Sequence, residues 1–351
     1  MNKLLFVLPG PSKKIIGGYK IVYIYADYLS GLGYDVNIVY LTNSFVTNRW
    51  FIGFKGVLKK NYYHFYKFYS WYPFKNKVKH LVRNELTQND INDYSMIFLS
   101  SVKVAEYFYK YKHRNINYLI QGFEDWSVNL DRLYETYNCY NNISISDFLT
   151  NKIESLGFDI SLQINNGIEA GDFLLNKPYS NRDNIILFMY HESPLKGVDS
   201  LLKVFKESNI KNKYKIICFS AYKKPKDLPN YIEFNYKPSK MDLCNLYNKA
   251  KFFIVSSQTE GFCLTAAEAM ACGTIVITTD NGGVNDFIID GKTGFYLKNN
   301  DFSKLESLIS TIEKKSNLSE ISRLSCNKIH SEYSWETSFQ KLSKYVHIGC
   351  K

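Results

Sequence analysis

Apolar runs and amphipathic segments alternate along most of this chain. Between the first two apolar runs, Ile21, Ile24, Tyr25 and Tyr28 recur at helical spacing, which predicts a helix over residues 19–32. A loop over residues 9–18, ending in Gly-Gly, precedes that helix. Buried strands are predicted where Val, Ile, Leu and Phe cluster, at residues 3–8, 35–41, 96–99, 118–120 and 143–146. Strands that alternate with helices are typical of a parallel α/β sheet.

A second series of the same kind begins near Asn184. Its predicted strands are residues 185–190, 215–219, 251–255 and 274–278, and its predicted helices are residues 196–205, 242–250 and 265–271. The stretch 167–183, which contains Gly171 and Pro178, separates the two series and is the best candidate hinge. The pattern therefore predicts two doubly wound α/β domains that face each other across a cleft, where open parallel sheets usually bind ligands.

Length and composition agree with this fold class. The chain has 351 residues and 40.9 kDa, enough for two domains with separate cores. It contains no apolar run long enough to predict a transmembrane helix. Seven cysteines, an odd number without a CxxC pair, argue against a disulfide framework or a zinc site. They favour a reducing, cytoplasmic location.

The net charge of +11 is unevenly distributed. Residues 36–84 contain nine Lys or Arg and no Asp or Glu, together with the aromatic runs W-F-I-G-F around Trp50 and Tyr62–Phe74. Such a block suits anionic lipid headgroups, but the aromatic residues could equally be core with lysines on the solvated face. Single-stranded nucleic acid is the least favoured partner, since no nucleic-acid-binding signature accompanies the block. We expect peripheral contact with the inner face of the cell membrane through residues 49–83, and no nucleic acid.

The segment Glu260–Gly273, E-G-F-C-L-T-A-A-E-A-M-A-C-G, carries the most specific chemistry. A predicted strand, a short polar loop and an alanine-rich helix follow one another here, and the amides at a helix start favour phosphate. Glu260 and Glu268 would repel phosphate, so sugar or ribose hydroxyls are their natural partners. The segment thus suggests a nucleotide-sugar site, although a capping carboxylate and a solvated helix face are the ordinary alternatives.

In its wider context this segment resembles the signature of the retaining family 4 glycosyltransferases of GT-B fold, the type found in bacterial surface-polysaccharide synthesis. The carriers of the resemblance are Glu260-x7-Glu268, Gly17-Gly18 before a helix, N-N-G-I-E-A-G-D-F from Asn165, S-P-L-K-G around Lys196, the D-N-G-G run from Asp280, and Y-S-W-E around Trp335. The last resembles the start of a C-terminal helix that crosses back to the first domain. The resemblance implies an acceptor-side domain over residues 1–170, a nucleotide-sugar domain over 171–333 and that helix over 334–351.

The resemblance also implies roles for individual residues. Lys196 would neutralise the donor diphosphate, Glu260 would bind sugar hydroxyls and Glu268 the ribose. The remaining donor-binding residues would be Gly18, His191, Gly261, Phe262, Cys263, Leu264 and Thr265, the last four through backbone amides. Catalysis would depend on Glu260, Lys196 and Gln121 through positioning and electrostatics, with no side-chain nucleophile. No D-x-D triplet is present, so neither a metal nor another cofactor is expected.

Two positions depart from the family pattern. His191 stands where the family usually has arginine; histidine can still donate to phosphate but is not reliably charged at pH 7. Gln121 stands where the family commonly has histidine, and glutamine can form hydrogen bonds but cannot exchange protons. Gln121, Glu124 and Asp125, together with Gly17, form the candidate acceptor-side cluster. Each of these residues, like Lys196 and Gly18, also has an ordinary structural alternative.

The resulting hypothesis is a retaining, metal-independent hexosyltransferase. It would move a sugar from a nucleotide diphosphate sugar to a lipid-linked glycan in O-antigen or capsule synthesis. A nucleotide-sugar epimerase of the same fold, or a non-catalytic nucleotide-sugar-binding assembly partner, are the alternatives. Base recognition is expected mainly from the backbone near Ser220 and Tyr236, so uridine, guanosine and thymidine donors remain open.

Overall fold

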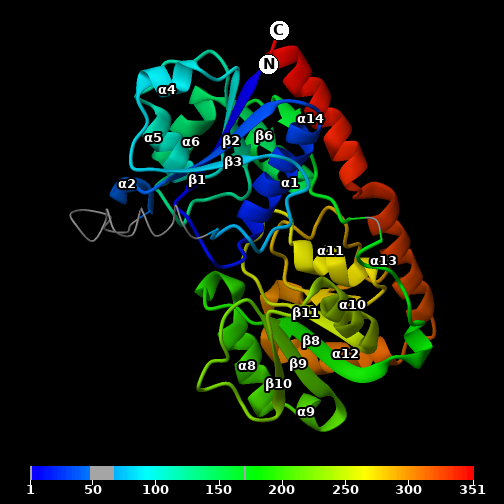
Figure 1. Cartoon of the computed structure of the whole chain (residues 1–351). Helices are drawn as coiled ribbons and strands as arrows, with labels where there is room; N and C mark the ends of the chain where they lie inside the picture. Colours follow the sequence, from blue (N-terminus) through cyan, green and yellow to red (C-terminus); the bar gives the residue numbers. More distant parts are fainter. Residues whose placement is uncertain (1, 48–66, 170) are drawn as a thin grey trace. The chain divides into compact units, whose positions relative to one another are not determined.

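A computed structural model describes residues 2–47, 67–169 and 171–351 of the protein (Figure 1). The chain divides into two compact units. The first contains Met1–Asn165 and Thr337–Lys351, and the second contains Asn166–Glu336. Residues 167–183, expected to be a hinge, belong to the second unit, where Ile168 forms a β-bridge with Ser334.

The first unit is built on a parallel sheet of seven described strands in the order β3-β2-β1-β4-β5-β6-β7. The strands are β1 (Lys3–Pro9), β2 (Asp35–Leu41), β3 (Lys79–Arg83), β4 (Met96–Leu99), β5 (Ile116–Ile120), β6 (Asn141–Ser144) and β7 (Leu162–Gln163). In β1, Leu4 to Leu8 are all buried. This continuous burial explains why its residues are apolar on both faces, as expected for a parallel sheet covered by helices.

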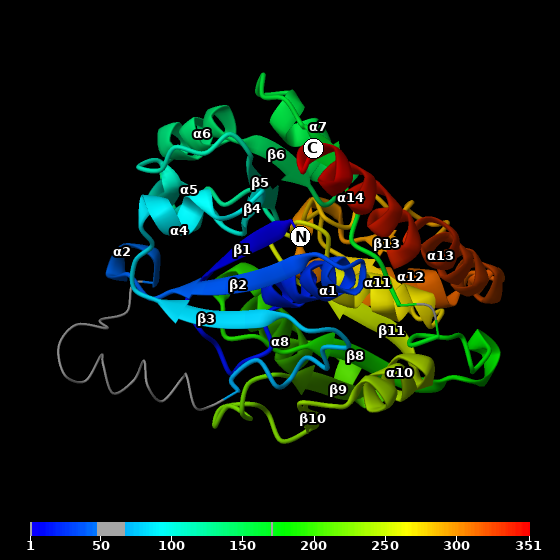
Figure 2. The same cartoon turned by 45° about the horizontal axis from the view of Figure 1, so that its top comes forward.

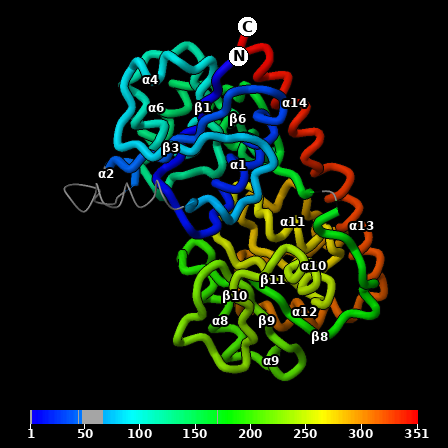
Figure 3. Tube along the Cα trace, viewed as in Figure 1, coloured from blue at the N-terminus to red at the C-terminus, as the bar shows by residue number. Residues whose placement is uncertain are grey.

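Helices cover both faces of this sheet (Figure 2). They are α1 (Gly17–Gly31), α2 (Ser44–Thr47), α4 (Gln88–Asn92), α5 (Val102–Phe108), α6 (Leu130–Cys139), α7 (Asp147–Glu154) and α14 (Trp335–Gly349). The terminal helix α14 packs on α1, where Phe339 stacks on Tyr28 with ring centroids 4.0 Å apart. Asn2 and Cys350 both bond to Ser95, which places the two chain ends close together (Figure 3).

The second unit has a parallel sheet of six described strands in the order β10-β9-β8-β11-β12-β13. The strands are β8 (Asp183–Met189), β9 (Lys215–Ser220), β10 (Ile232–Tyr236), β11 (Ala250–Val255), β12 (Ile275–Thr278) and β13 (Phe295–Tyr296). The helices are η1 (Tyr179–Asn181), η2 (Pro194–Lys196), α8 (Val198–Glu207), α9 (Ile210–Lys213), α10 (Lys240–Lys249), α11 (Leu264–Ala271), η3 (Lys298–Asn300), η4 (Phe302–Lys304), α12 (Leu305–Glu313) and α13 (Leu318–Glu332). Two Rossmann-like parallel-sheet units confirm the predicted α/β fold class.

Several predicted boundaries were wrong by a few residues. The loop before the first helix ends earlier than expected, because Gly17 and Gly18 already form the first turn of α1. The strand expected to reach Ser146 ends at Ser144, and Ser146 instead caps α7 by accepting the amide of Leu149. The helix expected from Lys196 begins at Val198, since Lys196 lies in the short helix η2.

The basic aromatic block is described only in part, since residues 49–66, including the run around Trp50, lie outside the described residues. In the described part, Phe68 is buried and Tyr69 stacks on His80 at 3.6 Å between ring centroids. Burial lowers the pKa of His80 to about 4. The aromatic side chains described here therefore contribute to packing, while Lys67 and Lys75 are exposed.

Within the described residues, no helix has both the length and the apolar character needed to cross a membrane.

Candidate functional site

The order of strands in the second unit locates a switch point. From β8 the chain winds outward to β9 and β10 on one side, and later to β11, β12 and β13 on the other. β8 and β11 are neighbours, with Phe253 paired to Leu187. Ligands of open parallel sheets bind beyond the carboxyl ends of the strands at such a point. Lys196 follows β8 and Glu260 follows β11, so topology brings both residues to this edge.

Lys196 and Glu260 form an ion pair there. Lys196 Nζ lies 2.5 Å from Glu260 Oε1, and the Ser257 hydroxyl donates to the same oxygen at 2.6 Å. The two charged side chains are 25% and 15% exposed, so both can still meet a ligand. Burial lowers the pKa of Lys196, but attraction and hydrogen bonding from Glu260 outweigh it and leave the pKa above its ordinary value. Lys196 is therefore a cation at neutral pH.

Gly197 fixes the position of Lys196. Its φ of +62° is left-handed, and a Cβ at this position would lie 2.1 Å from the carbonyl oxygen of Ser256. The Ser256 hydroxyl donates to the Lys196 carbonyl at 2.7 Å, and the Gln258 amide donates to the Leu195 carbonyl at 2.8 Å. The turn after β8 is thus joined to the loop after β11, which explains why glycine follows the lysine.

Gly283 supports the loop that holds Glu260. The Glu260 amide donates to the Asn281 carbonyl at 2.8 Å, and a Cβ on Gly283 would lie 2.6 Å from the Phe262 nitrogen and 2.9 Å from the carbonyl carbon of Gly261. The Phe262 side chain is buried against Phe287. The D-N-G-G run therefore supports the loop 260–262 by close backbone packing.

The helix after this loop begins where the sequence predicted an anion-binding amide cluster. Leu264 and Thr265 lie in the first turn of α11, whose amides have no carbonyl one turn earlier to bond. Cys263 precedes them with φ +65°, an uncommon conformation for a residue with a side chain. Burial raises the pKa of the Cys263 thiol to about 12, so the thiol is protonated and is not a nucleophile.

Glu268 does not lie on a solvated helix face. It is 5% exposed on α11, and the Tyr247 hydroxyl donates to its Oε2 at 3.3 Å. Burial, followed by the nearby carboxylate, raises the pKa of Tyr247 well above its usual value, so the phenol keeps its proton. Tyr247 thereby fixes the orientation of this carboxylate.

His191 lies at the same edge, after β8. The Ser193 amide donates to His191 Nδ1 at 2.9 Å, and Nε2 lies 3.2 Å from the Tyr222 hydroxyl oxygen. Tyr222 follows β9, and its amide donates to the hydroxyl of Ser220. Ser220 itself is buried and Tyr236, at the end of β10, is half exposed.

In the first unit, Gly18 and Gln121 come together. A Cβ on Gly18 would lie 3.1 Å from Gln121 Oε1, and Gln121 Nε2 donates to the Ser100 carbonyl at 3.4 Å. Gly18 has no positive φ, so close approach to Gln121, and not a tight turn, accounts for glycine here. Gly17, one residue earlier, has open space around its Cα.

Glu124 lies beside the start of α5. Its Oε2 accepts the Val102 amide at 3.2 Å, and its Oε1 accepts the Tyr118 hydroxyl at 3.4 Å. Burial raises the pKa of Glu124 to about 7, against the smaller lowering effect of these hydrogen bonds. Asp125, the next residue, is exposed.

Sequence reasoning missed Ser257, Gly283 and Tyr222. Ser257 lies three residues before Glu260, and Gly283 is the second glycine of the quoted D-N-G-G run, so the sequence carried a usable signal for both. Tyr222 had none, because it meets His191 only through the pairing of β8 with β9. Among the described residues, no group of three or more His, Cys, Asp or Glu side chains is placed to hold a metal ion.

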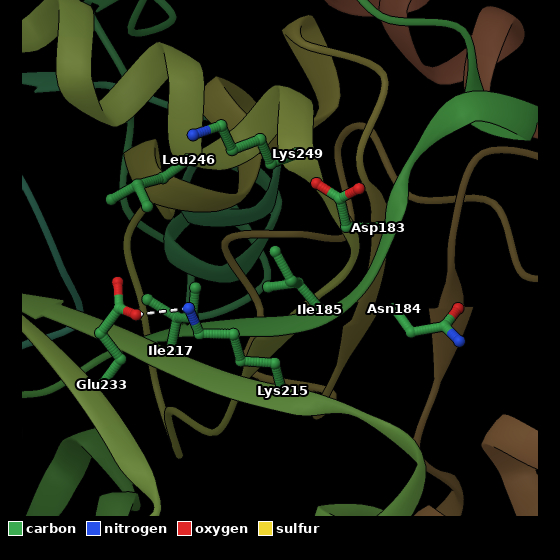
Figure 4. A pocket seen from close by; sticks show the side chains of 8 residues that line it. All are labelled: Asp183, Asn184, Ile185, Lys215, Ile217, Glu233, Leu246 and Lys249. Carbon is green, nitrogen blue, oxygen red and sulfur yellow. Dashed lines mark ion pairs between the residues drawn. The ribbon is translucent and has the colours of Figure 1, made fainter.

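A pocket of about 380 Å³ lies at the opposite edge of this sheet, near the amino ends of β8, β9 and β10 (Figure 4). Lys215 and Glu233 form an ion pair of 2.5 Å on its wall, and Ile185 and Ile217 also line it. Because it is far along the strands from Lys196, it plays no part in the site at the carboxyl edge.

Two Rossmann-like parallel-sheet units are the architecture of the GT-B fold. HepE from Anabaena, solved in complex with UDP-glucose, shares this fold with a TM-score of 0.71 at 15% identity, over 99% of this chain and 100% of that one. Residues 175–326 match the family model described as glycosyl transferases group 1, and this segment is a group 1 glycosyltransferase domain.

Two curated relatives agree with this assignment. An uncharacterized glycosyltransferase of Methanocaldococcus jannaschii is 28% identical over 209 residues, which cover 58% of each chain. The capsular polysaccharide biosynthesis glycosyltransferase CapM of Staphylococcus aureus is 27% identical over 208 residues, covering 53% of this chain and 54% of the relative. The chain thus spans little more than half the length of these relatives.

Proposed function

We propose that the protein is a retaining glycosyltransferase that transfers a hexose from a nucleotide diphosphate sugar to a lipid-linked glycan in surface-polysaccharide synthesis. The observation that carries the proposal is the pairing of Lys196 with Glu260 at the switch point, beside the first turn of α11. A cation, a carboxylate and helix-start amides in one place suit a diphosphate joined to a polyol.

Each group has a defined task in this proposal. Lys196 exchanges part of its contact with Glu260 for the diphosphate, and it stabilises the charge that builds up on the leaving phosphate. Glu260 accepts hydrogen bonds from sugar hydroxyls, and Glu268, oriented by Tyr247, accepts them from the ribose. Lys196 supplies the positive charge that a metal ion would otherwise give, so transfer is independent of divalent cations. The leaving phosphate takes the proton of the acceptor hydroxyl.

Two relatives support the choice of substrates. HepE is solved with UDP-glucose, which supports a nucleotide-sugar donor for this chain. CapM is named for capsular polysaccharide biosynthesis, which supports a glycan acceptor of that class.

The acceptor side of the proposal includes membrane contact. In the described part of the basic block, Lys67, Lys75, Lys77, Lys79 and Arg83 are all exposed. Exposed cations attract anionic headgroups by about 1 kcal/mol for each charge near the bilayer, although Lys79 is already paired with Asp35 at 3.1 Å. A lipid-linked acceptor would be met at that surface, with Gln121 and Glu124 as candidate contacts in the first unit.

Transfer of radiolabelled sugar, measured with a panel of UDP-, GDP- and dTDP-sugars and a lipid-linked acceptor extract, tests the activity. Lys196→Ala and Glu260→Ala should each lower turnover by about 10²-fold or more, while Lys203→Ala, an exposed lysine on α8, should not. Near-normal turnover in the first two variants would refute the site. NMR of the product distinguishes retention from inversion.

The same assay separates the alternatives. An epimerase would isomerise the donor without acceptor, and a non-catalytic partner would bind donor without turnover in any combination. Flotation with liposomes tests the membrane contact: recovery should fall when phosphatidylserine is omitted or salt is raised, and should fall in Lys67→Gln/Lys75→Gln/Lys77→Gln. Equal flotation of this variant and the wild type would count against the proposed surface.

A further inference from the structure

His191 and Tyr222 form a pair at the carboxyl edge of the second sheet. β8 and β9 end side by side, with Met189 paired to Phe219 and the Tyr190 amide donating to the Phe219 carbonyl at 2.9 Å. The two side chains that follow meet edge to face, with ring centroids 4.8 Å apart and planes at 75°. His191 lies five residues before Lys196 in the chain, and Tyr222 follows the neighbouring strand β9.

The hydrogen bonds of His191 define where its proton lies. Nδ1 accepts the Ser193 amide at 2.9 Å, and an accepting nitrogen carries no hydrogen. The neutral ring therefore has its proton on Nε2, which donates to the Tyr222 oxygen 3.2 Å away. A cationic imidazole would point a second N–H at the Ser193 amide, so this geometry disfavours the charged form.

The position of the proton on His191 determines how the Tyr222 hydroxyl is oriented. Because its oxygen accepts from His191, its own hydroxyl hydrogen is directed to another acceptor. Burial, followed by the charge of Glu192, raises the pKa of Tyr222, and Lys196 partly opposes this rise. The phenol is thus a neutral donor within the electrostatic reach of Lys196.

Resting on the proposed function, we propose that Tyr222 binds the diphosphate of the donor nucleotide beside Lys196, and that neutral His191 is a positioning residue that aims its hydroxyl. The sequence suggested that His191 itself meets the phosphate in place of arginine. The geometry assigns that contact to a residue 31 positions further along the chain.

Calorimetric titration of the full chain with UDP, GDP and dTDP, and with the matching monophosphates, tests Tyr222. Tyr222→Phe keeps the ring and removes the hydroxyl. We expect it to weaken the diphosphate that binds wild type by about tenfold and the monophosphate by much less, since about 1.4 kcal/mol accompanies a tenfold change. Equal weakening of both ligands would mean that Tyr222 contacts the nucleoside, and no weakening would mean no contact; either result overturns the inference.

Two substitutions at position 191 separate positioning from local folding. In His191→Asn the side-chain oxygen can replace Nδ1 as acceptor for the Ser193 amide, but nothing replaces Nε2. In His191→Gln the side-chain nitrogen can replace Nε2 as donor to Tyr222. We expect the Gln variant to bind the diphosphate within about threefold of wild type and the Asn variant to match Tyr222→Phe, with no further loss in the double variant Tyr222→Phe/His191→Asn. Additive losses would overturn the positioning role.

The same measurements distinguish failure of the proposed function from failure of the inference about Tyr222. If wild type binds none of the diphosphates, both the function and the inference fail. If wild type binds and transfers sugar while Tyr222→Phe behaves like wild type, only the inference fails.

Discussion

At the residue scale, the ion pair between Lys196 and Glu260 makes the two groups competitors as well as neighbours. On the proposed function, a diphosphate would have to draw Lys196 away from a carboxylate 2.5 Å distant, and that carboxylate would also repel the phosphate. The Glu260 carboxylate would contribute favourable hydrogen bonds only when the diphosphate carries a sugar. On the proposed function, the pair would therefore favour the complete donor over the nucleoside diphosphate product and so promote product release.

This competition can be measured with Glu260→Gln. Removing the charge but keeping the shape should tighten the nucleoside diphosphate by about three- to tenfold, because Lys196 no longer has an anionic partner. Turnover should fall by about 10²-fold, because the sugar loses its strongest acceptor. Calorimetry and the transfer assay measure the two quantities separately. If the diphosphate binds more weakly in the variant, the two residues do not compete.

Glu124 gives a pH-dependent prediction. Its pKa is raised from 4.5 to about 7 by burial, so the folded chain holds this proton more tightly than the unfolded chain does. The stabilisation is complete below about pH 4.5 and is lost as pH rises towards and through 7. Glu124→Gln cannot ionise, so its stability relative to wild type should increase from pH 5 to pH 8 by up to about 3 kcal/mol.

Thermal unfolding of both proteins at each pH measures this difference. Asp125→Asn is the matched control, since Asp125 is exposed and adjacent. A difference between wild type and Glu124→Gln that stays constant with pH would show that the carboxylate is not desolvated.

At this scale the sequence singled out Lys196 and Glu260, which the structure brings together, but it did not predict the side chains that contact the candidate site residues. Glu260, Lys196 and Glu268 stood in a motif whose residue types and spacing limit the possible chemistry. The partners of these residues depend on contacts between distant positions. Ser257 lies three residues from Glu260, but Tyr247 lies 21 from Glu268 and Tyr222 lies 31 from His191. No local pattern marks such pairs before the strands are ordered.

At the scale of elements, the turn between β8 and α8 depends on a single glycine. Gly197→Ala would place a methyl group 2.1 Å from the Ser256 carbonyl in a left-handed conformation, so the turn has to move and Lys196 moves with it. We expect a loss of about 1–3 kcal/mol in stability and about 10²-fold in turnover.

Gly291→Ala separates the effect of a left-handed backbone conformation from the effect of the close contact with Ser256. Gly291 has a similar φ of +71° in the same unit, but a Cβ there meets no atom within 4 Å. Its alanine variant should lose about 1 kcal/mol from backbone strain alone and keep its turnover. If both variants lose activity equally, the close contact with Ser256 is not what positions Lys196.

The central strands could be predicted because both of their faces are buried, so their sequences are continuously apolar. The strands β3, β10 and β13 were missed for the opposite reason. In β10 only Ile232 is buried, and β3 contains Lys79, His80 and Arg83. Strands at or near a sheet edge have a solvated face, and their short mixed sequences resemble loops.

At the scale of the whole molecule, the second unit is continuous in sequence whereas the first is made of two segments. The ends of the second unit meet each other: the Ile168 amide donates to the Tyr333 carbonyl at 2.7 Å, and a Cβ on Gly167 would lie 2.5 Å from the Trp335 nitrogen. An end-to-end contact of this kind closes the unit on itself.

We therefore expect residues 166–336 expressed alone to fold and to bind the same nucleoside diphosphate as the full chain, within about tenfold in Kd. The unit has its own core, in which Phe188, Leu201 and Phe252 are buried, and it carries Lys196, Glu260 and Glu268. Circular dichroism and calorimetry test the two parts of the expectation. A fragment that folds but does not bind would place an essential donor contact in the first unit, for which Gly18 is the candidate.

The closed ends of the second unit have a consequence for how such chains can diversify. In the first unit, the Ser338 hydroxyl donates to the Asn165 carbonyl. The two positions of the first unit that flank residues 166–336 therefore also lie side by side. A homologous unit whose own two ends are adjacent can be inserted between these two positions without distorting either unit. On the proposed function, replacing residues 166–336 would change the sugar that is transferred and leave the acceptor-side unit unchanged, and the exchange needs the two junctions 165/166 and 336/337.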